Sequence, residues 1–318
     1  MIRKIFITGA AGFIGSHLTE KLYDFFCNSQ FVLYDKITYA ANIKYITKLL
    51  KKKNVKFIQD DLLNLKSLQT NLKNVDLAIN VAAESHVDNS FGNSLIFTKT
   101  NTLGTHCFLE ACRNQKVKRI IHVSTDEVYG ENINKPFTET QSLNPTNPYS
   151  ASKAGADMIV NAYKKSFKLN INTVRANNIY GIRQYPEKLI SKSIYNFLHN
   201  KKMTIHGKGN NYRFYLSVED FCDGMLQIIT KGKFQEIYNI ASDKKYKVTN
   251  VIKIISNYLN IDFKKNIKFI KDRPFNDKIY QINCNKLKKL SWKVKRNLED
   301  DIPRIIDWYI KNKNIFKK

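Results

Sequence analysis

The first half of this chain alternates short apolar runs with longer segments of helical periodicity, and this alternation constrains the fold more than any other feature. The runs are rich in β-branched and aromatic residues, as in strands that are buried on both faces of a sheet. Strand–helix alternation predicts an α/β protein with a doubly wound parallel sheet and right-handed crossovers. We expect helices over 14–22 and 95–112, and strands at 4–8, 31–34, 55–58, 77–81, 119–124 and 171–175.

A glycine-rich turn connects the first predicted strand to the first predicted helix. Its sequence, TGAAGFIG, places Gly9, Gly12 and Gly15 where the chain must turn sharply and approach a ligand closely. The N-terminus of the following helix offers unpaired N–H donors and the positive end of its dipole. This arrangement predicts a Rossmann-type site for the pyrophosphate of a dinucleotide.

Asp35 ends the second predicted strand, twenty residues after Gly15. A carboxylate at this point can accept hydrogen bonds from the adenosine ribose hydroxyls and would repel a 2′-phosphate. We therefore predict NAD as the cofactor. Lys36, beside this acid, leaves NADP as a minor alternative.

The second half of the chain is less regular. Beyond Gly181, Pro and Gly interrupt the pattern more often, and helical periodicity dominates near 187–199 and 248–259. We expect residues 1–181 to form an NAD-binding Rossmann domain, to which part of 214–242 returns. Residues 182–318 would form mainly a smaller C-terminal α/β substrate-binding domain.

Tyr149 and Lys153 form a YxxxK motif and are the first candidate catalytic residues. Residues at i and i+4 share one face of a helix. A lysine charge beside a phenol favours the tyrosinate, so we expect it to lower the pKa of the tyrosine, which is ordinarily near 10. Such a phenolate can take a proton from a sugar hydroxyl while the carbon gives a hydride to the nicotinamide.

Two adjacent acids, Asp126 and Glu127, follow Thr125 where the fifth predicted strand ends. Ligands bind at the carboxyl ends of strands in open α/β sheets. Neighbouring carboxyl groups push one another's pKa values apart, which allows one to act as an acid and the other as a base. After oxidation of a hexose at C4, such a pair could remove the C5 proton and protonate the departing C6 hydroxyl.

Four segments together resemble the nucleoside-diphosphate-glucose 4,6-dehydratases of the extended short-chain dehydrogenase/reductase family. They are 35–40 (DKITYA), 82–88 (AAESHVD), 124–130 (STDEVYG) and 148–153 (PYSASK). The resemblance covers essentially the whole chain. It implies NAD-dependent dehydration of UDP-glucose or dTDP-glucose to the 4-keto-6-deoxy sugar, an early step toward 6-deoxysugars such as rhamnose.

The resemblance also implies roles for individual residues. Asp126 would donate a proton to the C6 oxygen, Glu127 would be the C5 base, Tyr149 the C4-hydroxyl base and Thr125 a hydroxyl that holds the C4 oxygen, with Lys153 completing the catalytic set. The implied cofactor contacts are Gly9, Gly12, Phe13, Ile14, Gly15, Asp35, Lys36, Thr38, Asp61, Leu62, Ala82, Ala83, Ser85, Thr100, Tyr149 and Lys153. The implied substrate contacts are Ser85, Thr125, Asn178, Lys188, Leu189, Arg213, Asn239, Arg273 and Asn276.

The segment 273–277 departs from the bacterial dTDP-glucose pattern, because Phe275 and Asn276 stand where that pattern has Gly-His. It looks more like the UDP-glucose 4,6-dehydratase domain of plant rhamnose synthases. A single methyl group distinguishes the two bases, and it is worth only about 1–3 kcal/mol in a pocket. The choice between uracil and thymine therefore stays open.

The composition limits other classes of function. The formal net charge of +26 comes mostly from lysines scattered along the chain, so we expect a solvated basic surface and no nucleic-acid partner. No apolar run approaches the roughly 18 residues that span a bilayer. The apolar run that begins at Lys4 is expected to be a strand rather than a leader peptide. Five cysteines without CxxC spacing predict no metal site and a cytoplasmic location, and the resemblance implies a homodimer.

Two rival functions stay open at this stage. A UDP-sugar 4-epimerase or decarboxylase would share the fold, the cofactor and the YxxxK motif. A non-catalytic dinucleotide-binding protein would keep the fold but would have lost catalysis.

Overall fold

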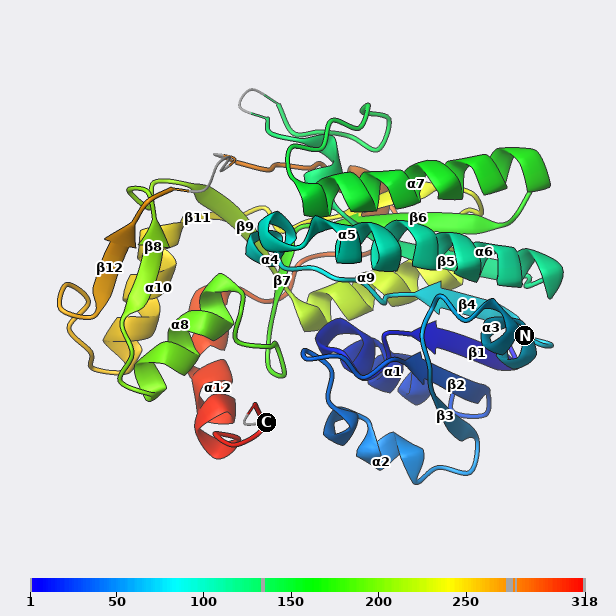
Figure 1. Ribbon diagram of the computed structural model, residues 1–318, viewed down its shortest axis with the longest axis horizontal. Helices are drawn as coiled ribbons and strands as arrows, with labels where there is room; N and C mark the ends of the chain where they lie inside the picture. Colours follow the sequence, from blue (N-terminus) through cyan, green and yellow to red (C-terminus); the bar gives the residue numbers. More distant parts are fainter. Residues whose placement is uncertain (1, 133–134, 273–276, 278, 317–318) are drawn as a thin grey trace.

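A computed structural model describes residues 2–132, 135–272, 277 and 279–316 (Figure 1). Its main element is a seven-stranded sheet in the order β10-β6-β5-β4-β1-β2-β3, in which every pairing is parallel. The strands are β1 (Lys4–Thr8), β2 (Gln30–Asp35), β3 (Val55–Gln59), β4 (Leu77–Asn80), β5 (Arg119–Thr125), β6 (Ile171–Ala176) and β10 (Ile237–Ile240). The predicted doubly wound parallel sheet is confirmed, and each of the six predicted strands lies within one residue of its expected bounds at either end.

Helices cover both faces of this sheet (Figure 1). The sheet and these helices form the first lobe, which therefore has three layers. On one face, α1 (Phe13–Phe25) and α9 (Val218–Lys231) pack into an apolar cluster that includes Leu18, Leu22, Phe221 and Met225. On the other face lie α3 (Leu65–Asn71), α6 (Gly104–Asn114) and α7 (Pro148–Phe167). Winding reverses between β1 and β4, so the loops that follow these strands flank the switch point where ligands bind in such sheets.

The helix expected over 95–112 is present but is not uniform. It consists of α5 (Ser94–Phe97), a π-helical segment η2 (Thr98–Leu103) and α6. Short π-helical segments are rare and often occur at functional sites. The remaining short elements of this lobe are η1 (Ile43–Tyr45), α2 (Thr47–Leu50), α4 (Val87–Gly92) and η3 (Asp126–Tyr129).

The second lobe is smaller and holds two minor sheets. One contains β7 (Asn178–Tyr180), β9 (Tyr212–Ser217) and β11 (Lys245–Lys247), and the other pairs β8 (Met203–His206) with β12 (Ile267–Ile270). Helices α8 (Leu189–Leu198), α10 (Val248–Tyr258) and α12 (Leu298–Lys311) share the apolar cluster of this lobe. The helices expected over 187–199 and 248–259 correspond to α8 and α10.

The chain passes between the lobes more often than the sequence predicts. Within 214–242, β10 joins the large sheet and α9 packs beside α1, whereas β9 belongs to a minor sheet of the second lobe. Residues 282–292, including α11 (Asn285–Lys288), also return to the core of the first lobe. The indole of Trp292 in this segment donates a hydrogen bond to the Asp220 carbonyl at 2.9 Å.

Candidate functional site

The glycine turn after β1 has the geometry that its sequence predicts. Gly9 adopts a φ of +66°, and a Cβ on it would lie 2.7 Å from the backbone nitrogen of Ala82. A Cβ on Gly15 would lie 1.9 Å from the Gly9 carbonyl oxygen. Gly12 is the N-cap of α1 and supplies no side-chain cap, so the first-turn N–H groups keep their capacity to bind an anion.

Asp35 ties the glycine turn to the loop after β2. One carboxylate oxygen accepts the Ala11 N–H at 2.9 Å, and the other accepts the Ile37 N–H at 2.7 Å. Burial raises the pKa of Asp35, and these backbone donors oppose that rise. Each oxygen retains a second lone pair, so the carboxylate can still accept a ribose hydroxyl.

The ammonium of Lys36 lies 2.7 Å from the Asp61 carboxylate. The Asp61 carboxylate thus already balances the Lys36 charge, which is the cation next to Asp35 in the motif. This weakens the case for NADP, whose 2′-phosphate would need that charge. A third loop follows β4, where the hydroxyl of Thr8 accepts the N–H groups of Val81 and Ala82. The remaining cofactor candidates lie on these loops or next to them: Phe13 and Ile14 open α1, Thr38 follows β2, Leu62 follows β3, Ala83 and Ser85 follow β4, and Thr100 lies in η2.

The two adjacent acids are buried where β5 ends. Asp126 is 2% exposed and Glu127 is 9% exposed, and both belong to the short η3 turn. The hydroxyl of Thr125 accepts the Glu127 N–H at 3.3 Å and donates to an Asp126 carboxylate oxygen at 3.2 Å. The strand end therefore fixes both acids relative to one hydroxyl group.

The surroundings of the two acids differ. Burial and the nearby Glu127 charge raise the pKa of Asp126 to about 7, although the Asn177 amide donates to its carboxylate at 2.7 Å. Burial also raises the pKa of Glu127, but the charges of Lys188 and Arg213 favour its ionised form. Asp126 can therefore hold a proton near neutrality, beside an acid whose rise in pKa is opposed by two cations.

Tyr149 and Lys153 occupy the first two turns of α7. Asn147 caps this helix by accepting the Ser150 N–H at 2.9 Å, and Pro148 opens it. The ammonium of Lys153 donates to the Val123 carbonyl at 2.7 Å, and burial lowers its pKa to about 8. Both functional side chains are buried beneath the end of β5.

The expected effect of the lysine on the tyrosine is wrong for this arrangement. Burial raises the pKa of Tyr149 above its usual range, and the Glu127 and Asp126 carboxylates raise it further, whereas a hydrogen bond with Thr125 opposes the rise. Desolvation disfavours the phenolate, and two carboxylates lie near it. Lys153 alone does not offset these effects.

Two predicted substrate cations reach this centre from the second lobe. The ammonium of Lys188, just before α8, donates to the Ser85 carbonyl and lies 5.7 Å from the centre of the Tyr149 ring. Arg213 in β9 lies 5.2 Å over the Tyr280 ring, and its charge acts on both acids. Two other predicted substrate contacts lie at the starts of second-lobe elements: Asn178 is the first residue of β7, and Leu189 is the first residue of α8.

Asn239 does not fit the predicted nucleotide contact. Its side chain is fully buried in β10, where it accepts the Tyr129 hydroxyl and donates to the carbonyls of Phe137 and Asn283. These bonds use the amide to hold a loop and the returning C-terminal segment against the sheet edge. Arg273 and Asn276, the other predicted substrate contacts, lie outside the described residues.

Sequence reasoning missed three polar groups around the acids. Asn177, just before the predicted Asn178, holds Asp126, and Asn147 donates to a Glu127 carboxylate oxygen at 3.3 Å. An Asn directly before Pro148 is a helix-cap signal that could have identified the second of these. Asp277 accepts the Thr146 hydroxyl at 3.0 Å and the Tyr280 hydroxyl, and its charge raises the pKa of Glu127.

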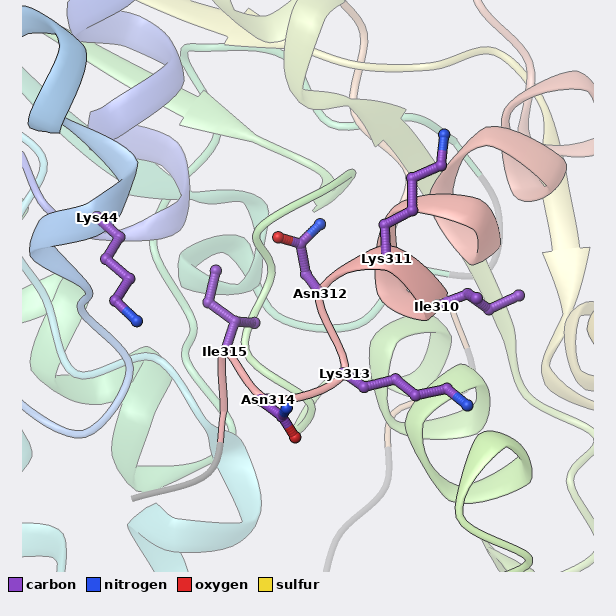
Figure 2. Close-up of a pocket in the computed structure, with 7 residues that line it drawn as sticks. All are labelled: Lys44, Ile310, Lys311, Asn312, Lys313, Asn314 and Ile315. Atoms are coloured by element: carbon purple, nitrogen blue, oxygen red, sulfur yellow. The ribbon is translucent and has the colours of Figure 1, made fainter.

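A cavity of about 400 Å³ lies away from this centre, between η1 and the segment that follows α12. Figure 2 shows Lys44 reaching toward Ile315 across it. No predicted site residue lines this cavity. Within the described part of the chain, no cluster of His, Cys, Asp or Glu has an arrangement that could hold a metal ion.

Comparison with known proteins identifies related sequences along nearly the whole chain. A family model described as GDP-mannose 4,6 dehydratase matches residues 6–305. The dTDP-D-glucose 4,6-dehydratase of Dictyostelium discoideum is 43% identical, and the match covers 98% of this chain and 83% of that protein. A trifunctional UDP-glucose 4,6-dehydratase/UDP-4-keto-6-deoxy-D-glucose 3,5-epimerase/UDP-4-keto-L-rhamnose-reductase of Arabidopsis thaliana is 42% identical, and the match covers 98% of this chain and 47% of that protein.

A solved structure has the same fold. The dTDP-glucose 4,6-dehydratase of Streptomyces venezuelae, crystallised with NAD bound, superimposes with a TM-score of 0.96 at 32% identity, and the match covers 99% of both chains. Because the family model and these relatives match the chain almost from end to end, this protein belongs to the nucleotide-sugar 4,6-dehydratase family that the GDP-mannose 4,6 dehydratase model describes.

Proposed function

We propose that this chain uses NAD to dehydrate a nucleoside-diphosphate-glucose, either UDP-glucose or dTDP-glucose, to the 4-keto-6-deoxy sugar nucleotide. The observation that carries this proposal is the buried pair of acids beside Tyr149, with the pKa of Asp126 raised to about 7. A plain dehydrogenase or epimerase needs the tyrosine but has no use for two carboxyl groups in its reaction centre. The product is the starting point for 6-deoxysugars such as rhamnose.

The residues present fit the cofactor. An uncapped helix N-terminus follows the glycine turn, and the Asp35 carboxylate beside this turn can accept a hydroxyl of the adenosine ribose. Ser124, at the end of β5, has a buried hydroxyl without a hydrogen-bond partner among the described residues, as expected where a ligand supplies that partner. When bound, NAD supplies the acceptor and later donor of the hydride, and its nicotinamide charge favours the phenolate of Tyr149.

Tyr149 and Thr125 act on the C4 hydroxyl of the sugar. The hydroxyl of Thr125 lies between the two acids and the phenol, so it can hold the C4 oxygen while Tyr149 takes its proton. Lys153 provides a buried positive charge on the same face of α7. Proton removal by this group is general base catalysis.

Glu127 and Asp126 then divide the elimination between them. A ketone at C4 makes the C5 proton acidic, and Glu127, which Lys188 and Arg213 favour as a carboxylate, removes that proton. Asp126 keeps a proton to higher pH than an ordinary carboxyl group and gives it to the departing C6 hydroxyl. The result is the loss of water across C5 and C6, after which C6 is reduced.

The substrate contacts stay proposals. We propose Ser85, Thr125, Asn178, Lys188, Leu189 and Arg213 as substrate contacts, and the expected set also includes Arg273 and Asn276. Matching relatives are named for dTDP-glucose in one case and for UDP-glucose in the other. We leave the base open between these two.

We also propose a homodimer formed through the helices of the first lobe. Large apolar side chains are exposed on this helical face, among them Leu95 at 78% and Met158 at 59%. The cytoplasmic location expected from the cysteine composition is likewise a proposal. No helix in the described ranges has the length and hydropathy to cross a membrane.

The decisive experiment incubates the purified chain with UDP-glucose and dTDP-glucose in parallel, with Glu127→Gln as the matched variant. We expect a 4-keto-6-deoxy product from the wild type. The variant should stop after C4 oxidation, because its amide cannot take the C5 proton. UDP-galactose as the sole product would instead identify an epimerase, and the absence of any turnover would favour a binding protein. Normal dehydration by Glu127→Gln would refute the assignment of the base.

A further inference from the structure

The connection between β7 and α8, which both belong to the second lobe, reaches across to the first lobe. Figure 1 shows this stretch hanging between the two lobes, beside the ends of α1 and α8. Within it, residues 183–188 contact three of the structural units that carry predicted cofactor contacts. These are α1 with its glycine turn, the loop after β2, and the loop after β4.

The first contact is made to α1. The guanidinium of Arg183 donates to both carboxylate oxygens of Glu20 at 2.9 Å, and to the Ser16 hydroxyl at 3.4 Å. Two parallel hydrogen bonds give this pair a defined geometry as well as charge complementarity. Arg183 itself adopts a left-handed φ of 67°, a conformation that non-glycine residues seldom hold unless the surrounding structure imposes it.

The second contact is made to the loop after β2. The hydroxyl of Tyr39 donates to the Glu187 carboxylate at 2.9 Å, and its ring packs edge-on against Tyr185 with centroids 5.2 Å apart. Tyr39 lies two residues after Ile37, whose N–H binds the Asp35 carboxylate. The bond therefore connects the second lobe to the loop that carries the predicted ribose-binding acid.

The third contact is made to the loop after β4. A ring nitrogen of His86 lies 3.0 Å from the Glu187 carbonyl oxygen, and the ammonium of Lys188 donates to the Ser85 carbonyl. Lys188 also lies over the Tyr149 ring. The same short stretch thus touches the cofactor loops and the reaction centre.

We propose that residues 183–188 form a strap that retains the cofactor between the first and last steps of each turnover. The inference rests on the proposed function, because that cycle imposes a requirement that an ordinary dehydrogenase does not have. The hydride taken from C4 must return to C6 of the same sugar after water has left. Release of the reduced cofactor before that return would leave an oxidised sugar with no hydride donor.

The strap makes release of the cofactor depend on opening the second lobe. To free the loops after β2 and β4 together, the chain must break the Tyr39–Glu187 bond and the contacts of His86 and Lys188. Opening the α1 side requires loss of the Arg183–Glu20 pair as well. Since Lys188 is also a predicted substrate contact, a bound sugar nucleotide would hold the strap closed.

The test measures the release of NADH from the full-length chain in the absence of sugar nucleotide. Protein loaded with NADH is mixed with excess NAD, and the loss of bound-NADH fluorescence gives the release rate. Tyr39→Phe removes one hydroxyl and keeps the ring, and Arg183→Gln removes the ion pair with Glu20. We expect each to accelerate release about tenfold and the double variant about a hundredfold, because a hydrogen bond to a charged group is worth about this much.

The matched control is Tyr163→Phe, which removes a Tyr–Glu bond of the same kind. The Tyr163 hydroxyl donates to Glu110 at 2.7 Å between α7 and α6, away from the strap. This variant should release NADH at the wild-type rate. Glu187→Gln retains a hydrogen-bond acceptor for Tyr39, so it should release NADH more slowly than Tyr39→Phe does.

Rates for Tyr39→Phe and Arg183→Gln within twofold of the control would overturn the proposal. A second readout separates this failure from failure of the proposed function. With sugar nucleotide present, the faster-releasing variants should accumulate free NADH and a 4-keto sugar that keeps its C6 hydroxyl. A chain without any dehydratase activity would still report the NADH release rates, so the strap can fail or hold independently.

Discussion

Asp126→Asn should make the folded protein more stable at neutral pH while it removes the acid for dehydration. Burial and the charge of Glu127 raise the pKa of Asp126 from 3.8 to about 7. The folded state therefore binds this proton more tightly than the unfolded state. Stability from this group is complete below pH 3.8 and is lost as the pH rises to about 7.

The size of the effect follows from the two pKa values. Each pH unit between them costs about 1.4 kcal/mol, so the ionised carboxyl destabilises the fold by about 4 kcal/mol above pH 7. An amide of the same shape carries no charge to desolvate. Relative to the wild type, the unfolding free energy of Asp126→Asn should rise by about 3 kcal/mol between pH 5 and pH 8.

The assay is urea denaturation of both proteins at pH 5 and pH 8. The control is Asp157→Asn, a buried acid of opposite behaviour. Burial opposes ionisation of Asp157, but the His122 ring 3.5 Å away and the charge of Arg175, which donates to this carboxylate at 2.8 Å, outweigh it and lower its pKa to about 2. That variant should lose about 2 kcal/mol or more at pH 8. Equal pH dependence of stability in Asp126→Asn and the wild type would refute the reasoning.

Three further predictions concern the cofactor turn, the acid and the helical face. Gly9→Ala should lower the unfolding free energy by about 2 kcal/mol or more, because its Cβ enters a backbone contact at positive φ. Gly12→Ala should weaken NAD binding while it lowers the unfolding free energy by only about 1 kcal/mol or less. Calorimetry measures the first effect and NAD titration the second. Asn177→Ala should move the alkaline limb of the kcat profile upward by about one pH unit, since its amide stabilises the ionised carboxyl; an unshifted limb would argue against the acid role. Met158→Asp should give a monomer in sedimentation while Phe269→Asp, on exposed β12, sediments as the wild type does; a Met158→Asp dimer would exclude that face.

The sheet was predictable because its determinants are local. An unbroken apolar run such as FVLY in β2 has few alternatives in a chain of alternating strands and helices. It was harder to predict which lobe each later segment joins, because this depends on contacts between residues distant in sequence. Trp292 packs in the first lobe through its bond to Asp220, and no periodicity near residue 292 indicates that partner.

The reaction centre was predictable as a set of residues but not as an electrostatic environment. The YxxxK spacing identifies Tyr149 and Lys153, yet the pKa of Tyr149 depends on burial and on two carboxylates that β5 brings beside it. Asn177 was missed for a similar reason. An asparagine has no titratable group to mark it, and only the fold reveals that its amide points at Asp126.

The repeated passage of the chain between the lobes has a mechanical consequence. Where two lobes share a single linker, they can swing apart about one hinge. Here the chain crosses between the halves before β7, after β9 and before β11, and the strap and the returning segment 282–292 add further contacts between them. Moving the two lobes apart must bend several connections at once, so we expect this motion to be stiffer than rotation about a single hinge. Neither half can be exchanged for that of a relative as a contiguous block, and specificity would have to be altered residue by residue.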